Sequence, residues 1–153
     1  MKSSLKNDLS SLMKALNNGY SIETDLRDCL GEVCISHDPV VTLTLTFSEF
    51  LMHFDRVNSI HPKIALNIKS DGLCDRVSEI ISETNCFLSH DFFFFDASIP
   101  DSLSYLNKDL PIYSRLSEHE HILAFEDRCA GVWIDSFVGR YDQIKAARQS
   151  CFE

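Results

Sequence analysis

Two carboxylates and a histidine lie close together in the first third of the sequence. Glu23 and Asp25 are two residues apart in a stretch that alternates, and His37 ends the next extended run. In a strand, residues two apart point to the same side. Neighbouring carboxylates repel unless one is protonated or a cation lies between them, and Mg²⁺ and Ca²⁺ take oxygen ligands of this kind. The spacing therefore fits a divalent metal site with His37 beside it as a general acid or base.

Taken alone, each of these features has a more common structural meaning. A Glu-x-Asp pair usually marks the solvated face of an antiparallel sheet, and a single histidine near a loop is usually a surface or capping residue. What favours the functional interpretation is the longer string over residues 19–28, with Gly31 and residues 35–39 after it.

That string closely resembles the glycerophosphodiester phosphodiesterase family, whose barrel is of the phosphatidylinositol phospholipase C type. Members carry Glu-x-Asp on the second barrel strand, then a turn with glycine, then a strand that ends in His-Asp. The resemblance implies metal ligation by Glu23 and Asp25 and general acid/base chemistry by His37. Residues 66–69 and 132–135 resemble later barrel strands, and residues 93–100 and 113–118 resemble a bacterial subgroup.

The sequence departs from the family pattern in two places. The His-Arg-Gly motif that ends the family's first strand is missing, so its second catalytic histidine is missing too. An ungapped match also puts Lys69 where members usually have a metal-binding glutamate, with Asp71 two residues later. The other histidines stand in no matching context and are expected on the surface or in helices: His53, His61, His90, His119 and His121.

Three interpretations of Lys69 stay open. Its ammonium group could neutralise the phosphate and partly replace the ion, or Asp71 could complete the metal shell while Lys69 binds substrate. Lys69 could also pair with Glu23 or Asp25 and leave the site inactive. Arg115, near the end of a later strand, is either a phosphate contact or part of a structural ion pair.

The hydrophobic pattern predicts strands that alternate with helices, which is typical of a parallel sheet covered by helices. A capping-box spacing of Ser117 and Glu120 predicts a helix over residues 117–125. The expected helices are 5–16, 47–57, 73–81, 100–106, 117–125 and 141–147, and the expected strands are 20–27, 33–36, 63–68, 92–95, 111–114 and 132–134.

The resemblance and this order together imply an incomplete (β/α) TIM-type barrel that lacks the first and last strands. We expect residues 1–153 to form this single partial barrel domain, because no linker divides the chain. A complete barrel has eight strands and about 250 residues. A barrel that lacks strands has open edges, and we expect these edges to allow self-association. Periodicity alone also fits an open doubly wound domain like a response regulator, but that fold does not account for residues 37–39.

Composition and charge indicate which classes of binding partner to expect. The net charge of −9 argues against a nucleic-acid surface. No apolar run is long enough for a membrane anchor, the first residues do not form a signal peptide, and the six cysteines lack a Cys-x-x-Cys pair. We therefore expect a cytoplasmic enzyme that hydrolyses a small phosphodiester with Mg²⁺ or Ca²⁺. The alternative is a degenerate barrel that binds a phosphorylated ligand without catalysis.

Overall fold

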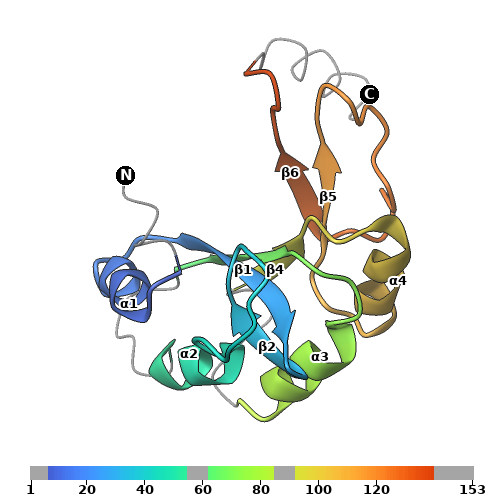
Figure 1. Ribbon diagram of the computed structural model, residues 1–153. Helices are drawn as coiled ribbons and strands as arrows, with labels where there is room; N and C mark the ends of the chain where they lie inside the picture. Colours follow the sequence, from blue (N-terminus) through green and yellow to red (C-terminus); the bar gives the residue numbers. More distant parts are fainter. Residues whose placement is uncertain (1–6, 55–61, 85–91, 140–153) are drawn as a thin grey trace.

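The chain folds into a four-stranded mixed sheet with helices against one of its faces, and a two-stranded sheet rises beside it (Figure 1). This computed structural model describes residues 7–54, 62–84 and 92–139. The helices are α1 (Leu9–Asn17), α2 (Phe47–Phe54), α3 (Cys74–Ser82) and α4 (Ile99–Asn107). The strands are β1 (Ile22–Cys29), β2 (Glu32–Ile35), β3 (Ile64–Ile68), β4 (Phe92–Phe95), β5 (Tyr113–Leu116) and β6 (Gly131–Ile134).

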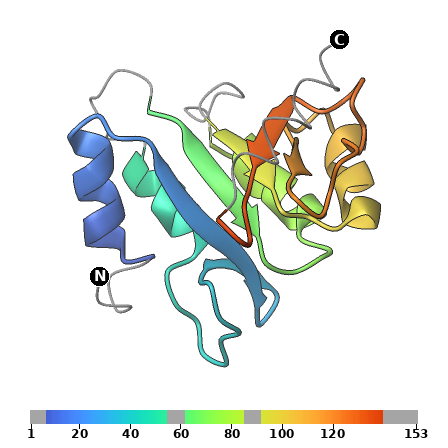
Figure 2. The ribbon, with the colours of Figure 1, turned by 90° about the horizontal axis from the view of Figure 1, so that it is seen from above.

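Five of the strands are parallel to their neighbours and follow one another in chain order. One sheet has the order β2-β1-β3-β4, and a second consists of β5 and β6. A parallel bridge from Phe94 to Ile112 joins β4 to the residue before β5. From above, β1, β3 and β4 follow one another across the molecule, and β5 and β6 lie beyond them (Figure 2).

The sixth strand, β2, runs antiparallel to the second half of β1. The turn between them places both Leu30 and Gly31 at positive φ, 53° and 86°. Two such residues are typical of a type I′ turn, whose twist matches that of a hairpin. This hairpin brings the end of β2 back toward the middle of β1.

Alternation along the strands gives the sheet two different faces. Leu26, Leu66 and Phe94 belong to the main hydrophobic core, which packs against apolar side chains from all four helices. The residue next to each of these on its strand points to the opposite, open face of the sheet. There Asp25, Asn67 and Phe95 lie side by side in register. The helices thus cover one face, and the open face carries polar and aromatic groups.

The expected order of strands and helices is confirmed from residue 9 to residue 107 and again for β5 and β6. The described residues form no closed barrel, so the barrel itself is not confirmed. The expected helix over residues 141–147, like His61 and His90, lies outside the described residues.

The helix expected over residues 117–125 is wrong. Ser117 and Glu120 do exchange capping bonds, since the Ser117 hydroxyl accepts from the Glu120 N–H at 3.1 Å and donates to its carboxylate at 3.1 Å. Their backbones, however, close a tight turn on each other at 3.1 and 3.2 Å. The Glu118 carboxylate accepts from the distant Val138 N–H at 2.6 Å, and Ile122 is 88% exposed. Bonds to distant residues therefore replace those of a helix.

Gly131 allows an aromatic ring to lie against the start of β6. A Cβ atom there would stand 2.5 Å from the Tyr113 ring, which itself stacks on Phe93 with 3.9 Å between the ring centroids. We predict that Gly131→Ala lowers the free energy of unfolding by about 1–3 kcal/mol through overpacking, as measured by urea denaturation. In a Tyr113→Ala background the same change should cost much less. An equal cost in both backgrounds would contradict this packing.

Candidate functional site

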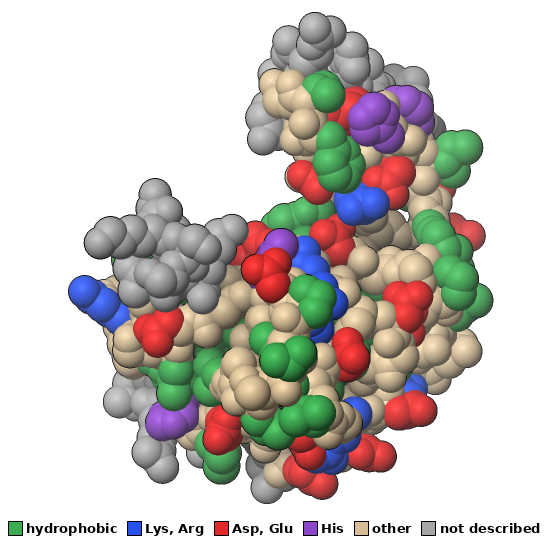
Figure 3. All heavy atoms as spheres, in the orientation of Figure 1, with side chains coloured by type: hydrophobic (Ala, Val, Ile, Leu, Met, Phe, Trp, Pro, Cys, Tyr) green, Lys and Arg blue, Asp and Glu red, His purple; other side chains and the backbone are tan. Residues whose placement is uncertain are grey.

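Charged residues gather where the parallel strands end. Lys69 directly follows β3, Asp96 follows β4, Asp135 follows β6, and Arg115 lies within β5. The carboxyl ends of parallel strands are where binding sites of α/β proteins usually lie. The surface is hollowed where β5 and β6 rise from the body of the molecule, and charged side chains border this hollow (Figure 3).

Asp25 and Lys69 form an ion pair on the open face. The Asp25 side chain is only 11% exposed, and its Oδ1 lies 3.5 Å from the Lys69 Nζ. Its Oδ2 accepts a hydrogen bond of 2.9 Å from Asn7, whose own carbonyl accepts from the Thr24 hydroxyl at 2.9 Å. The Lys69 N–H donates to the Leu26 carbonyl at 2.9 Å, which fixes the backbone beneath the ammonium group. Removing one partner of such a buried pair leaves an uncompensated charge.

The other two expected metal ligands lie elsewhere. Glu23 is exposed, near the start of β1. Asp71 lies between β3 and α3, and its Oδ2 accepts a hydrogen bond of 2.8 Å from the hydroxyl of Ser98, the N-cap residue of α4. The structure therefore keeps Glu23 and Asp25 on one strand, but it joins Asp71 to a helix cap.

The hairpin places His37 one residue beyond the contact of β2 with Asp25, and the Arg27 Nε donates to the His37 carbonyl at 3.2 Å. The Ser36 N–H donates to the Asp25 carbonyl at 3.2 Å, and His37 follows directly. The His37 Nδ1 lies 2.9 Å from the Asp38 Oδ1, and the imidazole is 58% exposed. Because a carboxylate only accepts hydrogen bonds, Nδ1 must donate in this contact, which leaves Nε2 to exchange a proton.

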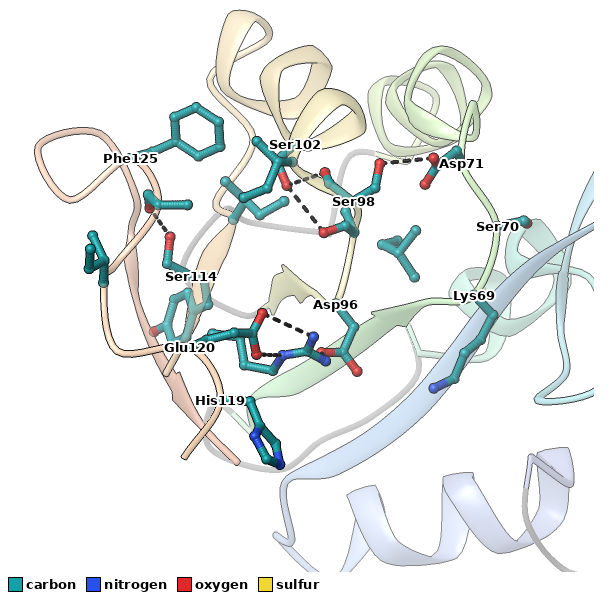
Figure 4. A pocket seen from close by; sticks show the side chains of 18 of the residues that line it. Lys69, Ser70, Asp71, Asp96, Ser98, Ser102, Ser114, His119, Glu120 and Phe125 are labelled. Carbon is teal, nitrogen blue, oxygen red and sulfur yellow. Dashed lines mark hydrogen bonds and ion pairs between the residues drawn. The ribbon is translucent and has the colours of Figure 1, made fainter. Parts of the chain in front are cut away.

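Arg115 is the centre of an ion-pair network (Figure 4). Its Nε and Nη2 donate to the two Glu120 oxygens at 2.5 and 3.1 Å, and its Nη1 donates to Asp96 at 3.0 Å. The hydrogen bond from Arg115 lowers the pKa of Glu120, and the hydrogen bond to Glu120 raises the pKa of Arg115. Of the two expectations for Arg115, the geometry therefore matches the structural ion pair.

A cavity of about 880 Å³ lies beside this network. Lys69, Asp71 and Arg115 line it, whereas Glu23, Asp25 and His37 do not. The carboxyl ends of the strands, which we call the rim, thus have two parts. One is the Lys69–Asp25 ion pair on the open face, the other is the cavity toward β5, and Lys69 belongs to both.

The donor set as it lies does not fit a divalent ion. No three His, Cys, Asp or Glu side chains of the described residues are grouped as metal ligands. The Asp25 carboxylate is held by an ammonium and an amide group, both of which compete with a cation for its oxygens. The expectation that Glu23, Asp25 and Asp71 bind Mg²⁺ or Ca²⁺ is untested, and the ammonium and amide partners of Asp25 lead us to expect no ion here.

Several residues of the site are not predicted by the sequence patterns. Asp96 directly follows a buried strand, which is a position typical of site residues. Its place in the sequence is therefore a signal by which it could be found. Glu120 was interpreted as a helix cap, although its carboxylate binds Arg115. His119, expected on the surface, is exposed but also lines the cavity.

Comparison with protein-family models, curated proteins and solved structures finds no match to this chain. In the parts of the chain that the structure describes, no helix has the length and apolar character to cross a bilayer.

The Arg115–Glu120 contact predicts a pH-dependent contribution to stability. The lowered pKa of Glu120 means that its stabilisation is present above the ordinary value of 4.5 and is lost as pH falls through the folded-state pKa. Glu120→Gln should therefore lower the free energy of unfolding at pH 7 by about 0.5–1 kcal/mol, because the pair is partly exposed. The difference from wild type should shrink as the pH is lowered below the ordinary carboxyl range in urea denaturation.

Glu126→Gln is the matched control, because it removes one exposed carboxylate from the same loop between β5 and β6. If the difference in unfolding free energy between wild type and Glu120→Gln stays constant over this pH range, the charge of Glu120 is not what stabilises the loop.

Proposed function

We propose that this chain is a phosphoric diester hydrolase of the glycerophosphodiester phosphodiesterase kind. The observation that carries the proposal is the Lys69 ammonium group, held 3.5 Å from the Asp25 carboxylate at the carboxyl end of β3 and bordering the cavity. A fixed positive charge at the rim of a parallel sheet is suited to an anionic ligand, and a phosphodiester carries one negative charge.

We further propose that β1, β3, β4, β5 and β6 are consecutive strands of a (β/α) barrel. Their parallel chain order supports this, as do the helices on the outer face and the charged residues at the carboxyl ends. Among the described residues β6 pairs only with β5, so its other edge is where we expect self-association.

In the proposed reaction Lys69 stabilises charge on the phosphoryl oxygens. The ammonium group donates hydrogen bonds to a non-bridging oxygen, on which negative charge persists as water attacks phosphorus. Asp25 holds the ammonium group in place, and Asn7 supports Asp25 from the other side. These contacts pre-organise the charge, so that little rearrangement is needed when the substrate binds.

His37 supplies the proton for the leaving group. Protonated at Nε2, it transfers that proton to the alkoxide as the phosphorus–oxygen bond breaks. Water adds a hydroxyl group to phosphorus and releases one proton, which restores the imidazolium. One phosphodiester and one water molecule thus give one alcohol and one phosphomonoester. Asp38 keeps the proton of Nδ1 in place during the exchange.

A second candidate function is binding of a phosphorylated ligand without hydrolysis. Two observations favour it: Asp25 is paired with Lys69, and Arg115 is occupied by Asp96 and Glu120. Such a protein would bind a phosphodiester through Lys69 and return it unchanged. Measurements of turnover and of binding on the same sample separate the two functions.

The hydrolase proposal predicts that His37→Ala slows hydrolysis of bis(p-nitrophenyl) phosphate by about 100-fold or more, the usual range for loss of a general acid. His53→Ala is the matched control, because His53 is an exposed histidine on α2. Release of p-nitrophenolate, followed by its absorbance, measures the rate. If the two variants hydrolyse the diester equally fast, His37 is not the acid, and if wild type has no turnover, the hydrolase proposal fails.

Both candidate functions predict that Lys69→Met weakens binding of dimethyl phosphate, as measured by isothermal titration calorimetry. We expect about a 10- to 100-fold loss, because a hydrogen bond to a charged group contributes about 1.5–3 kcal/mol. Lys14→Met removes an exposed lysine from α1 and should leave affinity unchanged. Lys69→Met alone leaves the Asp25 carboxylate without its ammonium partner and could destabilise the fold. The double variant Asp25→Asn/Lys69→Met removes both charges and is therefore measured as well. Unchanged affinity in the folded Lys69 variants would refute phosphate recognition by Lys69.

A further inference from the structure

The cavity beside Lys69 has two ends of different chemistry. Lys69, Asp96, Arg115 and Glu120 provide a charged end, and in Figure 4 Lys69 points into the space in front of Asp96. Phe125 and Ser114 lie on the opposite side from Ser70 and Asp71. The rest of the lining combines four serines, Asp71, His119 and His121 with a group of aliphatic and aromatic side chains, which includes Ala97, Ile99, Ile112, Ile122, Ala124 and Phe125.

Three of the four serine hydroxyls that line the cavity donate to protein acceptors, and the fourth, Ser70, accepts from the Asp28 N–H at 3.0 Å. Ser98 donates to Asp71 at 2.8 Å, Ser102 donates to the Ser98 carbonyl at 2.9 Å, and Ser114 donates to the Ala124 carbonyl. A sugar or another polyhydroxylated group would need donors and acceptors that are free to pair with it. The part of the wall that Ile112, Ile122 and Phe125 form therefore offers van der Waals contact beyond the charged end.

Two aliphatic side chains of the lining are also open to water. Ile122 is 88% exposed and Ile99 is 58% exposed, so both lie at the mouth of the cavity. Apolar side chains exposed around a cavity are typical of ligand-binding grooves, because a ligand removes them from water. A volume of about 880 Å³ is within the range of small-molecule sites.

We propose that this cavity binds the alkyl or acyl chain of an amphiphilic phosphodiester, with the phosphate at Lys69 and the chain along Ile112, Phe125 and Ile122. This inference rests on the proposed function and narrows its substrate class. The phosphate accounts for the charged end, and the chain covers the wall on which the hydroxyl donors are occupied.

Calorimetric titration with two probes tests the inference, both below the critical micelle concentration: dimethyl phosphate and methyl octyl phosphate. Burying a methylene group contributes about a fourfold gain in affinity, so even partial burial of the octyl chain should improve affinity by about tenfold or more. Ile122→Ser should reduce the ratio of the two dissociation constants. Val41→Ser is the matched control, because Val41 is also 88% exposed and does not line the cavity.

Equal affinity for the two probes in wild type would overturn the inference, and binding of dimethyl phosphate in that experiment would leave the proposed function standing. A gain from the octyl chain that Ile122→Ser does not reduce, or that Val41→Ser reduces as much, would also overturn it, because the chain would then bind elsewhere. Absence of binding by either probe would overturn both proposals. Octyltrimethylammonium, which has a chain but no phosphate, should bind more weakly than methyl octyl phosphate.

Discussion

Alternation of side chains along the parallel strands separates an apolar face from a charged one, and the site depends on this separation. Leu26 and Leu66 hold the sheet against the helices, while Asp25 and Asn67, one residue away on the same strands, must lie on the open face. An acidic side chain that is nearly buried there needs a positive partner. Lys69, at the end of the next strand, provides it at 3.5 Å.

Charge pairing also fixes the part of the rim near β4 and β5. Asp96 follows β4 on the open side, and Arg115 from β5 bridges it to Glu120. The loop after β5 is thereby fixed over the end of the sheet, where it forms one wall of the cavity. Charge pairing thus both stabilises the rim and shapes the space beside it, and the Lys69 ammonium is the cation at the point where cavity and open face meet.

Elements with strong periodicity could be predicted from the sequence. The strands over residues 20–27, 33–36 and 92–95 and the helices before residue 92 follow from apolar spacing, whereas the antiparallel pairing of β1 with β2 does not. The placement of Glu23 and Asp25 on one strand followed from the same rule. What could not be predicted depends on partners distant in sequence. Ser117 and Glu120 have the spacing of a helix cap, but Arg115 and Val138 bind that loop from outside. The pairing of Lys69 with Glu23 or Asp25 was one of three interpretations of the sequence, and the structure shows that Asp25 is the partner.

We propose that the Lys69 ammonium group occupies the place of the divalent ion that the sequence led us to expect beside Asp25. Calorimetric titration of Ca²⁺ and Mg²⁺ into the wild-type chain, into Asp25→Asn and into Lys69→Glu tests it most directly. We expect no saturable binding to wild type, and gain of a site in Lys69→Glu, where a further carboxylate would join Asp25. Stoichiometric binding of either ion by wild type, abolished in Asp25→Asn, would contradict it.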